Sequence, residues 1–98
     1  MDMEALMANA QNLQNNIAAA QESLSQKHVK GIADNGAVIV DMTGKYDVVS
    51  VVINPDVLSR GAAVVSGLVA DAYRDAKEKA DILIDEVMTQ VTGGVSLD

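Results

Sequence analysis

The sequence contains no cysteine, no phenylalanine and no tryptophan, and it has a single proline. Without cysteine the chain has neither a disulfide nor thiol chemistry, which fits a reducing compartment such as the cytosol. Tyr46 and Tyr73 carry the only aromatic rings apart from one histidine. With no large rings to fill a core, we expect small apolar residues packed between closely spaced helices.

The sequence also lacks the signals of a secreted or membrane protein. Residues 1–4 are acidic rather than basic, so a signal peptide is not expected. No apolar run approaches the roughly 18 residues that span a bilayer. We therefore expect a cytoplasmic protein without a membrane partner. A chain of 98 residues forms one domain, and a second subunit would add burial that so short a chain lacks.

Basic residues are scarce. Seven lysines and arginines face fourteen acidic residues, which gives a net charge of −7, so two copies would carry twice that charge. This acidity opposes the approach of nucleic acid at low salt. A local basic patch can still dominate within a Debye length of about 8–10 Å. The charge alone therefore leaves nucleic-acid and protein partners open.

Residues 1–26 predict a helix with a narrow apolar stripe. Its members alternate spacings of four and three, which is the pattern of one helix face: Leu6, Ala10, Leu13, Ile17, Ala20 and Leu24. At about 33 Å, the helix is longer than strands of six to eight residues can cover. The stripe therefore either covers the chain's own sheet or partly meets a second subunit.

Residues 27–53 predict a three-stranded antiparallel meander. The strands are expected at 27–34, 37–42 and 46–53. Asn35-Gly36 predicts a two-residue hairpin turn, and residues 43–45 predict the second turn. The third strand is apolar on both faces, so both faces need cover. Pro55 ends it, because proline lacks the N–H of a central ladder.

Residues 59–91 predict a long helix whose start is capped by Asp56 or Ser59. Gly93-Gly94 is expected to end it, and 92–98 then form a tail. Its apolar stripe comprises Val65, Leu68, Val69, Ala72, Ala76, Ala80, Leu83 and Val87. The predicted fold class is α+β, with an α-β-β-β-α protomer in a single domain over 1–98.

No catalytic or metal-binding constellation emerges from the sequence. His28 is the only histidine, and one histidine cannot make a zinc site. The pairs Asp71–Asp75 and Asp81–Asp85 have the carboxylates of a hard-cation site, but a solvated helix face explains them better. We expect no enzyme, no cofactor and no metal.

One group of residues carries a family resemblance. Gly44, Lys45, Val48, Val51, Ile53, Pro55 and Leu58 are followed near the end by Thr92, Gly93 and Gly94. In this order and spacing the chain resembles the YbaB/EbfC family of bacterial nucleoid-associated proteins. The resemblance implies an α-β-β-β-α protomer in an intertwined homodimer, with helices that project like the arms of tweezers. It also implies binding of double-stranded DNA in the nucleoid, with roles in nucleoid organisation or gene regulation.

The chain departs from that family in its first helix. Family members often carry lysines there, whereas residues 1–26 contain no basic residue. The candidate DNA contacts are therefore the amides Asn9, Asn12 and Asn16 and the cations Lys27, Lys30, Arg74, Lys77 and Lys79. Lys27 and Lys30 are expected to cluster with His28 on one strand face. We predict weak, salt-sensitive DNA binding, and the alternative is an acidic dimeric module that binds a protein partner.

The predicted dimer also needs an apolar interface. The residues expected in the core or at that interface are Leu13, Ile17, Val49, Val51, Ile53, Val65 and Val69. An interface that completes the core of a small domain is large and mostly apolar.

Overall fold

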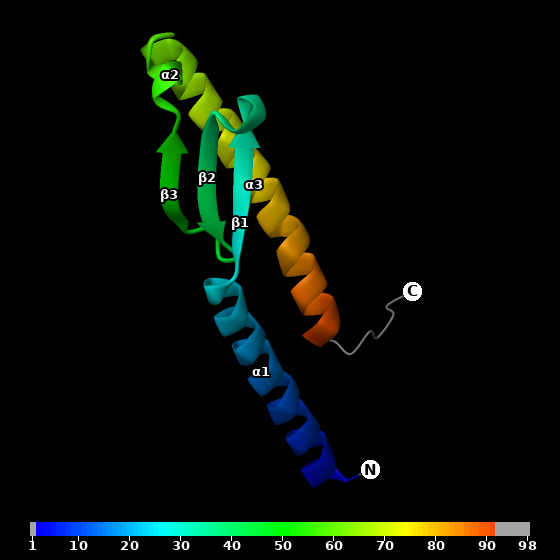
Figure 1. Ribbon diagram of the computed structural model, residues 1–98. Coiled ribbons are helices and arrows are strands. Elements are labelled where there is room, and N and C mark those ends of the chain that lie inside the picture. The colour runs from blue at the N-terminus through cyan, green and yellow to red at the C-terminus, as the bar shows by residue number, and fades with distance from the viewer. Residues whose placement is uncertain (1, 92–98) are drawn as a thin grey trace.

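The computed structural model describes residues 2–91, and it confirms the α+β class and the α-β-β-β-α order. The elements are α1 (Met3–Gln26), β1 (His28–Ala33), a short 3-10 turn (Asp34–Gly36), β2 (Val38–Thr43), β3 (Val48–Ile53), α2 (Pro55–Leu58) and α3 (Ala62–Val91). The antiparallel sheet has the order β1-β2-β3. Figure 1 shows α3 crossing behind the sheet, while α1 extends away from the end of β1.

The core lies between α3 and one face of β1 and β2. Ala72, Ala76 and Ala80 of α3 are fully buried against Val40 and its neighbours on β2. At Gly31 of β1, an added Cβ would lie 1.9 Å from the carbonyl oxygen of Ala72. The helix therefore sits as close to the strand as the backbone allows. Small residues do pack the core, but between a helix and a sheet rather than between two helices as expected.

The third strand stands outside this core. Five of its six residues are exposed, with Val49 at 55% and Val52 at 58%. The strand register places Val51 beside the buried Val40 on the α3 side, and Val52 beside Ile39 on the opposite side. Apart from Ile53 at its end, β3 is left uncovered by the other described residues, although its composition is that of a strand buried on both faces.

Over the described residues 2–91, the first helix packs against the other elements only through its last turns. Ala20 and Leu24 are buried against α3, where Val87 is their main buried partner. Residues 3–16 are all exposed. The apolar stripe does not cover the sheet, so that alternative is wrong. A 24-residue helix is about 36 Å long, whereas six-residue strands span about 20 Å.

The seven predicted core or interface residues are not part of the buried core. Leu13, Val49 and Val51 are exposed, and Ile17, Ile53, Val65 and Val69 are half-buried. Ile53 and Val69 pack against the margin of the core cluster. Within one protomer, these residues therefore remain available to a partner.

The molecule is elongated. Its radius of gyration is 19.0 Å, whereas a compact chain of this length has about 13 Å. Its accessible surface is 6782 Å², against about 5,400 Å² for a compact monomer of the same mass. The surface therefore exceeds that of a compact monomer by about 1,400 Å².

The first turn and the strand limits differ from the sequence prediction. Ala33 pairs with Val38, so four residues rather than two join β1 to β2. Asp34, Asn35 and Gly36 all adopt positive φ, and the amide of Ala37 donates to the carbonyl of Asp34 at 3.1 Å. The two-residue hairpin is therefore wrong, because asparagine and aspartate also accept the left-handed conformation.

The second turn and the entry to α3 also differ. Thr43 belongs to β2, and the turn is closed by the amide of Tyr46, which donates to the carbonyl of Thr43 at 3.0 Å. Pro55 ends β3 and also begins α2, where proline at the first helical position costs no hydrogen bond. Asn54 caps α2, and Asp56 lies inside that helix. Because α3 begins only at Ala62, neither Asp56 nor Ser59 caps it. The predicted helix end and tail at 92–98 lie outside the described residues.

Candidate nucleic-acid interface

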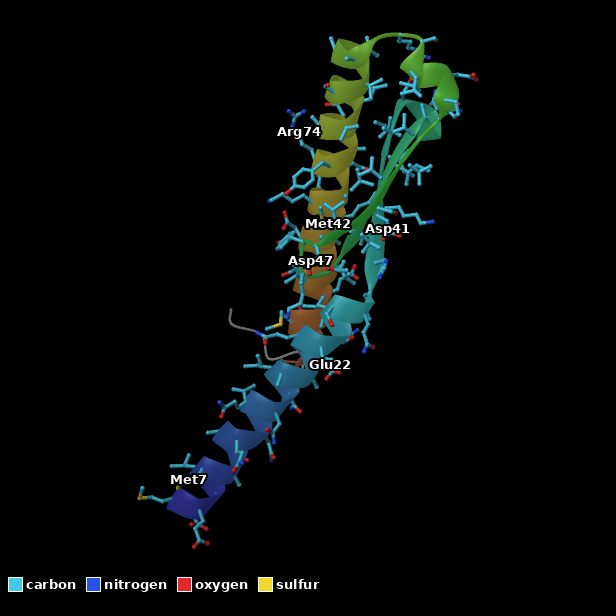
Figure 2. All side chains as sticks on the ribbon, turned by 90° about the vertical axis from the view of Figure 1, so that its left-hand side faces the viewer. Met7, Glu22, Asp41, Met42, Asp47 and Arg74 are labelled. Carbon is cyan, nitrogen blue, oxygen red and sulfur yellow. The ribbon has the colours of Figure 1, made fainter. Side chains whose placement is uncertain are left out.

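Four of the seven basic residues are paired with acidic side chains. Arg60 contacts Asp34 at 2.8 Å. The other three pairs lie along α3: Arg74–Asp71 at 2.9 Å, Lys77–Asp81 at 3.6 Å and Lys79–Asp75 at 3.0 Å. Figure 2 shows Arg74 projecting from α3 to the side away from Asp41 on the sheet. The α3 cations therefore do not form a basic patch, because each lies beside a carboxylate.

Lys27, Lys30 and Lys45 have no ion-pair partner within residues 2–91. They lie on three different elements. Lys27 follows α1 directly as its C-terminal cap, Lys30 lies in β1, and Lys45 lies in the turn before β3. Because Lys27 precedes β1, the predicted cluster of Lys27 and Lys30 on one strand face is wrong.

His28 and Lys30 do share one face of β1, and the carboxylate of Asp41 on β2 lies on the same face. The register places Lys30 opposite Asp41, and the Asp41 carboxylate lies 2.7 Å from Nδ1 of His28. His28 is exposed, as expected. Its pairing with Asp41 was not foreseen, because it joins residues on two strands. This acid reduces the positive potential around Lys30.

Lys27 is one of the residues that line a hollow between α1 and α3. The hollow has a volume of about 330 Å³ and is lined by Asn16, Ala19, Ala20, Ser23, Lys27, Val87 and Gln90. An ammonium group, two amides and a hydroxyl thus converge on one open site. These groups are donors of the kind that contact phosphate oxygens.

The three candidate asparagines continue this site along α1. Asn9, Asn12 and Asn16 are spaced by three and four residues, so they share one helix face. Lys27 follows Asn16 by eleven residues, close to three whole helical turns, and so ends the same row. Of the eight candidate contacts, Asn16 and Lys27 line the same hollow, and helical spacing places Asn9 and Asn12 on the same face of α1 as Asn16. Lys30, Arg74, Lys77 and Lys79 are not part of this row.

A second set of α3 side chains closes the free edge of β1. The amide of Ile32 donates to Asp75 at 2.8 Å, and Nζ of Lys79 donates to the carbonyl of Lys30 at 2.8 Å. The hydrogen bond from Ile32, helped by Lys79, lowers the pKa of Asp75. We name Asp75 and Lys79 the edge clip. Asp75, which the sequence analysis assigned to a solvated helix face, and Lys79, a candidate DNA contact, thus both have a structural role.

Tyr46 ties the second turn to α3. Its hydroxyl donates to Asp81, and Nζ of Lys77 lies 5.7 Å from the centre of its ring. The hydrogen bond with Asp81 raises the pKa of Tyr46, and burial and the negative charge of Asp81 add to that shift. Lys77 is therefore engaged by both a ring and a carboxylate.

Within the described residues, no group of three metal-binding side chains is present. The carboxylates considered for a cation instead meet protein donors: Asp71 meets Arg74, and Asp75 is held by the edge clip contacts. Over the same residues, neither long helix is apolar enough to cross a membrane.

Comparison with known proteins gives matches over nearly the whole chain. Residues 1–95 match the YbaB/EbfC DNA-binding family. This chain belongs to that family. It is 38% identical over 96 residues to a nucleoid-associated protein of Cyanothece sp., covering 98% of this chain and 84% of the relative. It is 36% identical over 101 residues to a nucleoid-associated protein of Acinetobacter baumannii, covering 99% and 93%.

A solved structure supports the fold. The crystal structure of an uncharacterized protein from Helicobacter pylori superposes with a TM-score of 0.62 at 18% identity, covering 90% of this chain and 98% of the other. At this identity the likeness concerns the fold alone. The family membership predicted from the sequence motifs is therefore confirmed, and the chain belongs to a family of nucleoid-associated DNA-binding proteins.

Proposed function

We propose that this protein is a homodimeric nucleoid-associated protein that binds duplex DNA without catalysing a reaction. The observation that carries the proposal is the row of amides on α1 that ends at Lys27 beside an open hollow. Family membership supplies the ligand class. In this role the protein acts in the nucleoid of the cytoplasm, where it organises DNA or regulates genes.

The second copy covers β3. Valines on both faces of this strand, with Val49 and Val51 among them, are exposed and are not covered by the other residues of the range 2–91. The excess surface of about 1,400 Å² exceeds the roughly 800 Å² per partner that a standard interface buries. Ile53 and Val69 pack against the margin of the core, and Val65 is half-buried on α3. The other two residues predicted at an interface, Leu13 and Ile17, lie on α1, outside the contact proposed through β3.

The charge distribution sets the strength of DNA binding. If Lys27 and Lys30 of two copies each contact a phosphate, about four counterions are released and the log–log salt slope is about −3.6. Between 50 and 200 mM salt the affinity then falls roughly 100-fold. The neutral amides of α1 add hydrogen bonds without counterion release. Binding is therefore weak and steeply dependent on salt.

The test is fluorescence anisotropy of a labelled duplex, titrated with protein at about 50 and 200 mM salt. Lys27→Ala should weaken binding and make the salt slope shallower by about 2 units, since two copies each lose a contact. Lys45→Ala removes an equally unpaired charge from a turn outside the α1 row, so it is the matched control. Equal effects of both variants would contradict a site at Lys27.

A protein-interaction module is the second candidate. The exposed apolar residues of α1 favour it, with Met3 at 72% and Met7 at 68% exposed. The pairing of four of the seven cations with acids also favours it. Absence of DNA binding at 50 mM salt would select this candidate over the first.

A further inference from the structure

The exposed part of α1 carries a strict heptad pattern. Its apolar positions, which we name the α1 seam, are Met3, Leu6, Ala10, Leu13 and Ile17. They alternate spacings of three and four and continue into Ala20 and Leu24, which are already buried against the helix α3. An apolar repeat of 3.5 residues matches a second helix that packs along it, not a sheet or a nucleic-acid groove.

Among residues 2–91, this seam has no partner. Leu6 is 50% and Leu13 is 47% exposed, and Met3 is more exposed than either. Figure 1 shows why: α1 continues well past the end of α3, so no other element lies beside its first half. A row of large apolar side chains is therefore left to solvent over about three helical turns or more.

The flanks of the seam identify the helix that fits it. In a coiled coil the positions beside the seam decide which partners are accepted. Here the six residues at those positions are all uncharged: Met7, Asn9, Gln14, Asn16, Gln21 and Ser23. The only charges between residues 3 and 26 are Glu4 and Glu22, and both lie away from the seam. A second copy of α1 thus meets this helix without like-charge repulsion.

No other described helix of this chain offers the same match. The long helix α3 carries paired acids and bases along its exposed surface, for example Asp71, Arg74 and Lys77. Because the net charge is −7, two copies repel each other electrostatically through their other surfaces. The lack of lysines on α1, which weakens contact with DNA, is the same feature that permits this helix to bind itself.

We propose that the α1 helices of two copies of this chain pair along the α1 seam. This contact uses a different element from β3 and does not require DNA. It adds to the proposed dimer, and the two self-contacts on each chain then build assemblies of more than two chains. DNA-bound dimers joined in this way would be bridged through protein rather than through one dimer holding two duplexes.

Cysteine cross-linking tests the pairing directly, because the chain has no cysteine of its own. Ala10 lies at the centre of the seam, so it faces its own copy in both a parallel and a centred antiparallel pair. Under mild oxidation, Ala10→Cys should form at least tenfold more disulfide-linked pairs than Ala8→Cys, which places the thiol on the outer face. Equal cross-linking of the two variants would overturn the proposal.

Light scattering over a concentration series separates this contact from the proposed dimer. The molar mass of the wild type should rise above that of two chains as the concentration increases. The double variant Leu6→Glu with Leu13→Glu should keep the mass of two chains at every concentration. Ala8→Glu with Asn15→Glu adds the same charges at the same spacing on the outer face and should behave as wild type. A seam variant with the wild-type mass at every concentration contradicts the pairing. A seam variant that falls to one chain supports the pairing and contradicts the dimer through β3.

Discussion

The two edges of the sheet differ in what covers them. At β1 the edge clip of Asp75 and Lys79 binds the outward backbone groups of Ile32 and Lys30. At β3 the edge carries exposed valines on both faces, and no described helix covers it. A free apolar edge invites pairing with another chain, and proteins usually block it. Within residues 2–91, the protomer therefore blocks the β1 edge and leaves the β3 edge open.

Breaking the covered side should have the largest effect. Gly31→Val places a side chain against the backbone of α3, which cannot move away without displacing the buried alanines. We expect a loss of about 3 kcal/mol or more in unfolding free energy, measured by urea denaturation at fixed protein concentration. Gly67→Ala is the control, because nothing lies within 4 Å of its added Cβ. It should instead stabilise α3 by about 0.5–1 kcal/mol. A loss from both variants would contradict this account of the packing.

Placing a charge at each edge should sharpen the comparison. Val51 on β3 and Ile32 on β1 are 43% and 46% exposed, so they form a matched pair. Val51→Lys should weaken self-association about 100-fold, roughly 3 kcal/mol, because a buried ammonium lacks a partner. Ile32→Lys should leave association unchanged. Sedimentation equilibrium measures both, and an equal effect at the two edges would show that they do not differ.

Removing the edge clip charge should have the smallest effect. The folded pKa of Asp75 lies below its ordinary value of 3.8. Its contribution is therefore complete above the unfolded pKa and is lost as the pH falls through the folded pKa. Asp75→Asn should cost under about 1 kcal/mol at pH 7, because the partly exposed carboxylate is screened by solvent. The difference in melting temperature between the variant and the wild type should begin to shrink below about pH 4 and should vanish once the pH is below the folded pKa of Asp75. A gap that persists at pH 2 would contradict the charge as its cause.

The sequence predicted the fold because its periodicities are clear. The stripe through Ala72, Ala76 and Ala80 specified the buried face of α3, and the valines of β3 specified a strand that needs cover on both faces. The motif around Gly44 and Pro55 gave the family. The short helix α2 was missed because an Asn-Pro sequence fits both the end of a strand and the cap of a helix.

The candidate site was only partly predictable. Asn9, Asn12 and Asn16 follow from helical spacing, so their common face was accessible to sequence reasoning. The hollow beside Lys27 was not, because it depends on where Gln90 of α3 meets α1. Likewise, the contact of Asp75 with Ile32 joins residues 43 positions apart, and no local pattern signals it. Of the four ion pairs that lysine and arginine make among the described residues, only Arg60–Asp34 joins two elements, whereas the other three lie within α3 at spacings of three or four residues.

Amide hydrogen exchange at β3 tests the central claim most directly. At β1 the amide of Ile32 points outward to Asp75, so the alternation of an antiparallel sheet directs the backbone of Ile39 toward β3 and that of Val51 and Ile53 outward. If a second copy covers this edge, these two amides should exchange slowly, at rates close to that of Ile39. Exchange of Val51 and Ile53 as fast as in an unstructured chain, at concentrations where the protein self-associates, would contradict pairing of two copies through β3.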